Sequence, residues 1–359
     1  MDYKLRRFDW PLFFIFLVLT GVGLLTIFGI GASARSFFER QFWFLVMASG
    51  LIFFVSLWDY RILKNYSLAS MVLYGLTIVL LFISLKSSAV RGTSAWIALG
   101  SLRVEPSEFA KLAVIILLAK YFSQKHVEIY KAHHIIVSGF YVGLPAFMVL
   151  MQPDLGSAFI FFAIWLSMLL AAGIKRRHLV IILLASVVLS SVAWSGFLAP
   201  YQKSRISSFL NPYVNPRGEG YSIIQSRIAV GSGMFWGNGF GKGTQAGFGY
   251  LPEAHTDFAF ASFAEQFGFL GVAGLFSLLT LFLFRVGKIG FGTRNNFAKL
   301  FSIGLIAFIF SHVIINAGMN MGLLPITGLP FPFLSYGGSF LITLSLGLGL
   351  LESIKIRSS

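Results

Sequence analysis

A carboxylate and a histidine lie two residues apart where a long polar stretch meets an apolar run. They belong to the segment Leu251-Pro252-Glu253-Ala254-His255-Thr256-Asp257-Phe258. A carboxylate partly removed from water by the membrane, with His255 close by, can have a pKa suited to general-base catalysis. Residue type alone also fits Asp257 as the N-cap of the next helix. One histidine and one aspartate are too few to predict a metal site.

A second candidate region runs from Arg91 to Lys111. Its proline, Pro106, is suited to the first turn of a helix, with Glu108 in that turn, where the helix dipole favours an anion. Glu108 and Lys111 are then three residues apart on one helix face. They form either a surface salt bridge or, because ionisable groups near membrane depth are costly, part of a functional site.

A third region, Gln152 to Ser157, joins two apolar runs with almost no loop, so Asp154 must lie near the lipid head groups. The Pro-Asp-x-Gly pattern favours Asp154 as the N-cap of the following helix. Capping and a functional role are compatible.

The polar stretch from Pro200 to Asp257 contains the glycine-rich run Gly237 to Gly243. No apolar strand precedes this run, and no Gly-Lys-Ser/Thr follows in the required context, so a nucleotide site is not indicated. The glycines either let backbone amides approach a head group or pyrophosphate, or let an ordered loop turn tightly.

A fourth segment, from Asn316 to Ser339, is rich in Gly and Pro and contains no Lys, Arg, Asp or Glu. A broken segment at membrane depth is tolerated only where protein or a polar cavity satisfies its backbone. We therefore expect it to line the site as a re-entrant element.

Apolar runs position these four regions. Hydrophobic residues make up 57% of the 359 residues and charged residues 11%, which predicts a single integral membrane domain over residues 1–359. The expected fold is an all-α polytopic membrane protein with about ten transmembrane helices. The predicted spans are 10–30, 40–57, 67–85, 107–122, 134–151, 155–172, 178–198, 258–284, 297–316 and 339–354.

Charge predicts the orientation. Seventeen of the 28 Lys and Arg residues fall on the side that carries both termini, so we expect both termini in the cytoplasm. Residues 199–257 then form a large extracytoplasmic loop between the seventh and eighth helices, and eight of the 13 carboxylates lie on that outer side. The net charge of +15 is partly topological and attracts anionic membrane lipids, and it does not indicate nucleic-acid binding.

In chain order, the four polar segments are Arg91 to Lys111, Gln152 to Ser157, Pro200 to Asp257 and Asn316 to Ser339. In this order across about ten spans, they resemble the SEDS family (shape, elongation, division and sporulation) over nearly the whole chain. The short ends favour its rod-shape members. The matching motifs are Arg91-Gly92 to Trp96, Pro106-Ser107-Glu108 with Lys111, Gln152-Pro153-Asp154-Leu155-Gly156, Glu253 to Phe258, Pro325-Ile326-Thr327-Gly328 and Ser335-Tyr336-Gly337-Gly338.

The resemblance implies a peptidoglycan glycosyltransferase that polymerises lipid II at the outer face of the bacterial inner membrane, for cell elongation and rod shape. It also implies a class B penicillin-binding protein as partner. Asp257 is then the expected catalytic base, and the expected substrate-binding residues are Arg91, Glu108, Lys111, Asp154, His255, Thr256 and Ser335.

Two features of the resemblance leave questions open. The family often has Gln where this chain has Glu105, which leaves the role of Glu105 open. A divalent cation, Mg²⁺ or Mn²⁺, near Asp154 or Asp257 is compatible with the residue types, but their spacing does not establish one.

Two other functions also fit the sequence. Broken segments and charges at membrane depth describe a lipid-linked sugar flippase as well as an enzyme. The chain has no obvious inverted repeat, and its acidic residues gather on one side, which favours the enzyme. A non-catalytic scaffold of the wall-synthesis complex is the third interpretation.

Overall fold

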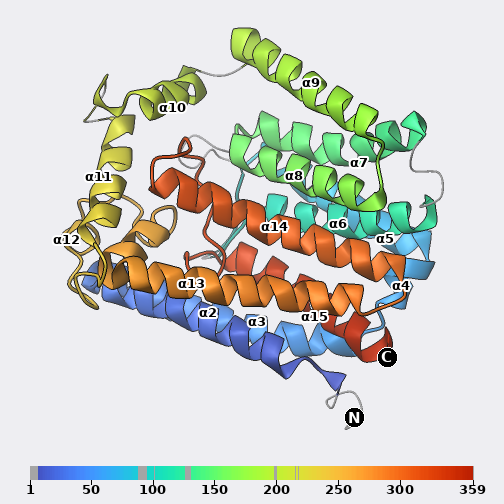
Figure 1. Ribbon diagram of the computed structural model, residues 1–359, viewed down its shortest axis with the longest axis horizontal. Coiled ribbons are helices and arrows are strands. Elements are labelled where there is room, and N and C mark those ends of the chain that lie inside the picture. The colour runs from blue at the N-terminus through green and yellow to red at the C-terminus, as the bar shows by residue number, and fades with distance from the viewer. Residues whose placement is uncertain are drawn as a thin grey trace.

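The computed structural model describes residues 7–87, 95–100, 102–125, 131–197, 200–214, 216 and 218–358. Ten long helices form the body of the molecule (Figure 1). They are α2 (Trp10–Gly29), α3 (Arg35–Leu57), α5 (Ser67–Leu85), α6 (Pro106–Lys125), α7 (Ala132–Met151), α8 (Leu155–Ala172), α9 (Arg176–Val192), α13 (Ala259–Phe291), α14 (Asn296–Asn320) and α15 (Gly338–Ser358). Each coincides with one of the predicted spans, so the all-α polytopic fold is confirmed.

Nine helices of the described chain are long and apolar enough to cross a membrane, and α6 is the long helix outside that set. Helix α6 carries Glu108, Lys111 and Lys120, and nearly all its side chains from Pro106 to Phe122 are buried. Neighbouring helices shield it from lipid, which makes these charges tolerable at membrane depth. The predicted span 107–122 was too short at both ends.

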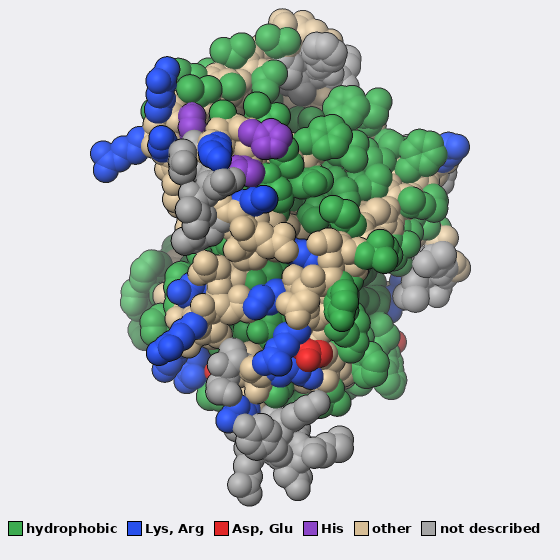
Figure 2. Space-filling model, turned by 90° about the vertical axis from the view of Figure 1, so that its right-hand side faces the viewer, with side chains coloured by type: hydrophobic (Ala, Val, Ile, Leu, Met, Phe, Trp, Pro, Cys, Tyr) green, Lys and Arg blue, Asp and Glu red, His purple; other side chains and the backbone are tan. Residues whose placement is uncertain are grey.

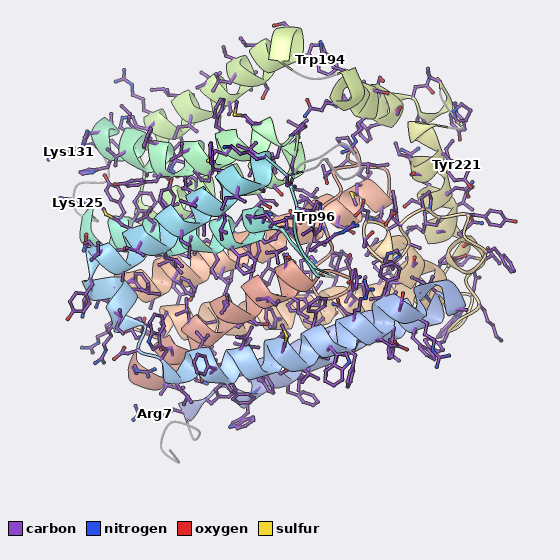
Figure 3. The ribbon with its side chains drawn as sticks, turned by 180° about the vertical axis from the view of Figure 1, so that it is seen from behind. Arg7, Trp96, Lys125, Lys131, Trp194 and Tyr221 are labelled. Atoms are coloured by element: carbon purple, nitrogen blue, oxygen red, sulfur yellow. The ribbon has the colours of Figure 1, made fainter. Side chains whose placement is uncertain are left out.

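The two ends of the bundle differ. The first described residues and the C-terminal helix lie at the same end (Figure 1), and Lys125 and Lys131 lie at one end while Tyr221 lies at the opposite end (Figure 3). Asp9 joins the ends of the chain, because it caps α2 and accepts a hydrogen bond from Lys355 Nζ of α15 (2.6 Å).

The described part of the connection between η2 and α13 lies at the end of the bundle opposite the termini (Figure 1). It contains α10 (Pro200–Leu210), the 3₁₀ turn η3 (Pro212–Val214), α11 (Glu219–Ser232) and α12 (Thr244–Gly247). Other short elements are η1 (Ala32–Ala34), α4 (Arg61–Asn65), the π-helical turn η2 (Ala193–Phe197), and an antiparallel hairpin of β1 (Ile97–Leu99) and β2 (Leu102–Val104). The sequence pattern did not predict this hairpin.

The glycine-rich run packs against a break in α13. Gly268 has φ 61° and ψ −164°, so the helix is interrupted there. The amides of Asn238 and Gly239 donate to the Glu265 and Gln266 carbonyl oxygens (2.9 and 3.1 Å). A Cβ atom on Gly237 would lie 2.2 Å from the Gln266 carbonyl oxygen. These contacts support the ordered-loop interpretation of the run.

Candidate functional site

Asp257 lies in the turn that precedes α13, one residue ahead of the helix N-cap, Phe258. Its carbonyl oxygen accepts hydrogen bonds from Asn316 Nδ2 and Asn320 Nδ2, both at 3.0 Å. The two asparagines are one turn apart on α14 and are fully buried. Helix α14 therefore fixes the backbone of Asp257 through bonds that do not occupy its carboxylate.

The segment between α14 and α15 passes beside Asp257. Asn316 Nδ2 also donates to the Leu329 carbonyl oxygen (2.7 Å), so one amide holds both Asp257 and this segment. A Cβ on Gly328 would lie 3.7 Å from Asp257 Oδ2. A Cβ on Gly156, at the start of α8, would lie 3.0 Å from Thr327 Cβ. Residues 327–329 therefore lie between the Asp257 turn and the start of α8, next to the candidate site.

Ser335 and Gln41 satisfy the polar backbone of this uncoiled segment. Ser335 Oγ accepts from the Phe331 amide (2.9 Å) and donates to the Thr256 carbonyl oxygen (2.6 Å). Gln41 on α3 accepts from the Gly337 amide (3.3 Å). A hydrogen bond from the Ser335 side chain to the Thr256 backbone thus joins these two predicted site residues, and Ser335 is itself buried.

His255 is held by its backbone and its ring. Its carbonyl oxygen accepts from the Tyr336 amide (2.8 Å). Its imidazole stacks on Phe37 of α3, with ring centroids 3.8 Å apart and planes at 27°. His255 therefore joins the Asp257 turn to both α3 and the segment before α15.

Two non-glycine residues of these segments have left-handed backbone, one in the Asp257 turn and one two residues before Ser335. Glu253 has φ 48° and Phe333 has φ 68°. Such conformations cost free energy, persist only where the surroundings impose them, and cluster at functional sites. Glu253 also accepts from Thr256 Oγ1 at its carboxylate (3.1 Å). The turn is therefore strained and held from several sides.

Asp154 is the N-cap of α8, because its carboxylate accepts from the Ser157 amide (2.9 Å). The capping interpretation is confirmed. The carboxylate also lies close enough to Glu105 to influence that group electrostatically. The two regions predicted separately from the sequence thus meet at the start of α6 and α8.

Glu105 lies immediately before α6. The pKa of Glu105 is raised to about 8, mainly by burial and also by the Glu108 and Asp154 carboxylates, against the lowering effects of the Lys111 ammonium and the Ser107 hydroxyl. Ser107 Oγ donates to the Glu105 carboxylate at 2.8 Å. At neutral pH this position is therefore largely uncharged, as the glutamine common in the family would be.

Glu108 and Lys111 form a buried pair, and the surface-salt-bridge interpretation is wrong. Lys111 Nζ donates to Glu108 Oε1 at 2.8 Å, and the two side chains are 0% and 1% exposed. His312 Nε2 on α14 lies 3.8 Å from the same oxygen, and His312 Nδ1 bonds the Phe308 carbonyl oxygen. The pair is enclosed by helices because α6 lies in the centre of the bundle.

Sequence reasoning missed the residues that hold the site together, namely Asn316, Asn320 and Gln41. A signal was present, since amide side chains inside apolar spans are costly unless they bond a partner. The predicted residue Arg91 lies outside the described residues. Within the part of the chain that the structure describes, no three His, Asp or Glu side chains are grouped to hold a metal ion.

Comparisons with known proteins agree with this architecture. The family model described as "FTSW_RODA_SPOVE: Cell cycle protein" matches residues 9–359. The chain is similar to Stage V sporulation protein E of Bacillus subtilis, at 35% identity over 99% of both chains. It is also similar to peptidoglycan glycosyltransferase RodA of Treponema pallidum, at 30% identity over 98% of both.

A solved structure has the same fold. It is described as "Structural coordination of polymerization and crosslinking by a peptidoglycan synthase complex", and it matches with a TM-score of 0.84 and 29% identity over 97% of each chain. The multi-pass bundle, the Asp257 turn and the matches over almost the full length lead to one assignment. The chain belongs to the FtsW/RodA/SpoVE family of cell cycle proteins, the SEDS family.

Proposed function

We propose that this protein is a peptidoglycan glycosyltransferase that polymerises lipid II into glycan strands for cell elongation and rod shape. The names of its relatives support the enzyme class. The observation that carries the proposal is the Asp257 turn, which is strained at Glu253 and fixed by Asn316 and Asn320. A pre-positioned carboxylate is what a glycosyl transfer to a sugar hydroxyl requires of its base.

In the proposed reaction the Asp257 carboxylate takes the proton from the 4-hydroxyl of the acceptor sugar. That oxygen attacks the anomeric carbon of the donor, whose configuration inverts, and undecaprenyl pyrophosphate leaves. Because pyrophosphate departs as a stable anion, one carboxylate base suffices where a glycosidase needs two. A base in this role typically contributes about 10² to 10⁴ in rate.

The other predicted residues divide into three groups in this proposal. His255, Thr256 and Ser335 hold the wall of the site, while Asp154 and Arg91 contact substrate. Lys111 is enclosed with Glu108, so it acts on the departing pyrophosphate through its charge rather than by direct contact. A divalent cation, if the reaction uses one, would lie near Asp257 or Asp154.

The lipid tail of the substrate requires an apolar path. An open groove of about 680 Å³ runs between α8 and α9 and is lined mainly by apolar residues, among them Phe159, Phe162, Val187 and Trp194. No residue of α9 is buried, and the helix stands apart from the rest of the bundle (Figure 1). The groove fits an isoprenoid chain that enters from the bilayer.

The proposed setting is the bacterial inner membrane, with both termini in the cytoplasm and the Asp257 turn on the outer side. The distribution of Lys and Arg supports this orientation. The proposed partner is a class B penicillin-binding protein, which would cross-link the product. The similar solved structure, which is described as a peptidoglycan synthase complex that coordinates polymerisation and cross-linking, supports this pairing.

The test is glycan-strand formation from labelled lipid II by the purified protein with its penicillin-binding partner. Polymer formation supports the enzyme. The same preparation is reconstituted in liposomes with lipid II on one leaflet. Movement of lipid II across the bilayer without polymer would favour the flippase, and neither activity from a folded complex would favour the scaffold.

A further inference from the structure

The end of the bundle that carries both termini contains an open polar pocket of about 820 Å³. Figure 2 views this end and shows Lys and Arg side chains gathered over its lower half, with few carboxylates. The lining comes from α4, the last turn of α6, the turn between α13 and α14, and the end of α15. The pocket therefore lies where several spans end, far along the helices from Asp257.

Four cations line the pocket, namely Arg61, Lys64, Arg294 and Arg357, and no described lining residue is acidic. Arg357 is engaged, since it bonds the Ser56 carbonyl oxygen (3.1 Å) and lies 3.6 Å from an Asp59 carboxylate oxygen. Lys64 and Arg294 have no carboxylate within 4 Å among the described residues. Their charge is therefore not neutralised by the described chain.

Two further features favour an anion, one in the lining of the pocket and one beside it on α6. Asn296, the first residue of the 25-residue helix α14, lines it, so the positive end of that helix dipole faces the pocket. Lys120 lies one turn further along the α6 face that presents Ser123 and Gln124. Its side chain is 96% buried, and its ammonium has no hydrogen-bond partner among the described residues.

We propose that this pocket binds a phosphate group, and that the phosphate belongs to the head group of an anionic membrane lipid. The depth of the pocket argues for a lipid, because its lining residues lie within about a turn of the ends of α6, α13, α14 and α15, where head groups lie. Guanidinium and ammonium groups are the donors that bind phosphate. A soluble phosphate ester would use the same groups.

The experiment compares two double variants of the full-length protein in neutral detergent. Lys64→Gln with Arg294→Gln removes two charges from the pocket. Arg176→Gln with Arg177→Gln removes two exposed charges at the same end, outside the pocket. Dioctanoyl phosphatidylglycerol, dioctanoyl phosphatidylcholine and sodium phosphate are the probes, and retained ligand is measured by native mass spectrometry.

We expect phosphatidylglycerol to bind the wild type in preference to phosphatidylcholine. The Lys64→Gln with Arg294→Gln variant (the pocket pair) should weaken phosphatidylglycerol binding roughly 30-fold, since each cation near the membrane surface contributes roughly a sixfold gain in affinity. The Arg176→Gln with Arg177→Gln variant (the outside pair) should keep phosphatidylglycerol affinity within about threefold of wild type. Lys64→Arg with Arg294→Lys, which keeps the charges, should retain binding.

Pocket-dependent binding of sodium phosphate without phosphatidylglycerol binding would assign the site to a soluble phosphate ester. The proposal is overturned if neither phosphate probe distinguishes the pocket pair from the outside pair. It is also overturned if a glutamate-rich peptide binds the pocket while both phosphate probes fail. Melting temperatures of all variants establish that each is folded.

Discussion

Asp257 and Asp154 both lie just before a helix, yet the surrounding residues hold them differently. The Asp154 carboxylate is occupied in capping α8 through the Ser157 amide. Asp257 is held by its carbonyl oxygen, which Asn316 and Asn320 both bond. The two asparagines fix the backbone that carries the Asp257 carboxylate, which supports the proposal that Asp257 is the catalytic base.

The buried Glu108–Lys111 pair makes a prediction about stability. Lys111→Met removes one partner and leaves the Glu108 carboxylate buried without its cation, so we expect a loss of about 3–5 kcal/mol in the free energy of unfolding. The double variant Glu108→Leu with Lys111→Met removes both charges and should recover most of that loss. Thermal unfolding in detergent measures both. Equal destabilisation by the single and double variants would contradict the pairing.

Glu105 makes a prediction about pH. Its pKa of about 8 in the folded protein exceeds the ordinary value, so the folded state favours the protonated form. The stability that this group contributes is complete below pH ~4 and is lost as pH rises through about 8. We expect the melting temperature of Glu105→Gln to rise relative to wild type between pH 5 and 8.5. A constant difference across that range would refute the shifted pKa.

At the scale of elements, the sequence predicted the helices well because ten apolar spans dominate it. The sequence pattern did not predict the features that hydropathy does not describe. The hairpin of β1 and β2 and the helices α10 and α11 lie in polar connections, where pattern is weak. The burial of α6 depends on which helices surround it, so a pair on one helix face looked like a surface pair.

The sequence motifs identified the residues of the candidate site, but not the side chains that hold their backbone in place. Asp257, His255, Thr256 and Ser335 come together as expected, because the Ser335 to Thr256 bond joins their two segments. Asn316 and Gln41 lie in other spans, and their partners are backbone atoms. An amide side chain in an apolar span indicates that it has a partner, but the sequence does not identify that partner, because any backbone carbonyl or amide could fill the role.

Helix α2 gives a prediction at this scale. Gly23 packs against the segment before α15, and a Cβ there would lie 2.1 Å from the Phe333 carbonyl oxygen. We expect Gly23→Ala to destabilise the protein by about 1–3 kcal/mol through overpacking. It should also lower polymerisation, since Phe333 lies two residues before Ser335, which bonds the Thr256 carbonyl oxygen.

Gly21→Ala is the matched control, because no described atom beyond its chain neighbours and the nearby backbone of α2 lies within 4 Å of the added methyl group. It should be neutral or slightly stabilising, as alanine is the better helix former. Similar losses in melting temperature for the two variants would contradict the close approach of α2 to Phe333.

At the scale of the whole molecule, the bundle separates two kinds of charge. Glu253, Asp257 and Glu265 belong to the end with the Asp257 turn. A cation-lined pocket lies at the end with both termini, where Lys and Arg side chains gather and few carboxylates are visible (Figure 2). This polarity matches the positive-inside rule, with Asp9 and Lys355 joining the two ends of the chain on the basic side.

Orientation can be tested directly because the chain contains no cysteine. A cysteine at Tyr213, which is 74% exposed beyond α10, should react with a membrane-impermeant maleimide applied from the outer side. A cysteine at Arg176, exposed at the start of α9, should react only after the membrane is opened. Labelling of Arg176→Cys alone in sealed preparations would reverse the proposed topology.

The most direct test of the proposed function compares Asp257→Asn with Glu253→Gln, the same change of acid to amide in the same turn. In polymerisation of labelled lipid II with the penicillin-binding partner, we expect Asp257→Asn to lower the rate by about 10² to 10⁴ while it keeps its melting temperature and lipid II binding. Glu253→Gln, which keeps an acceptor for Thr256, should remain within about tenfold of wild type. If Asp257→Asn polymerised lipid II at the wild-type rate, the assignment of Asp257 as the base would be contradicted.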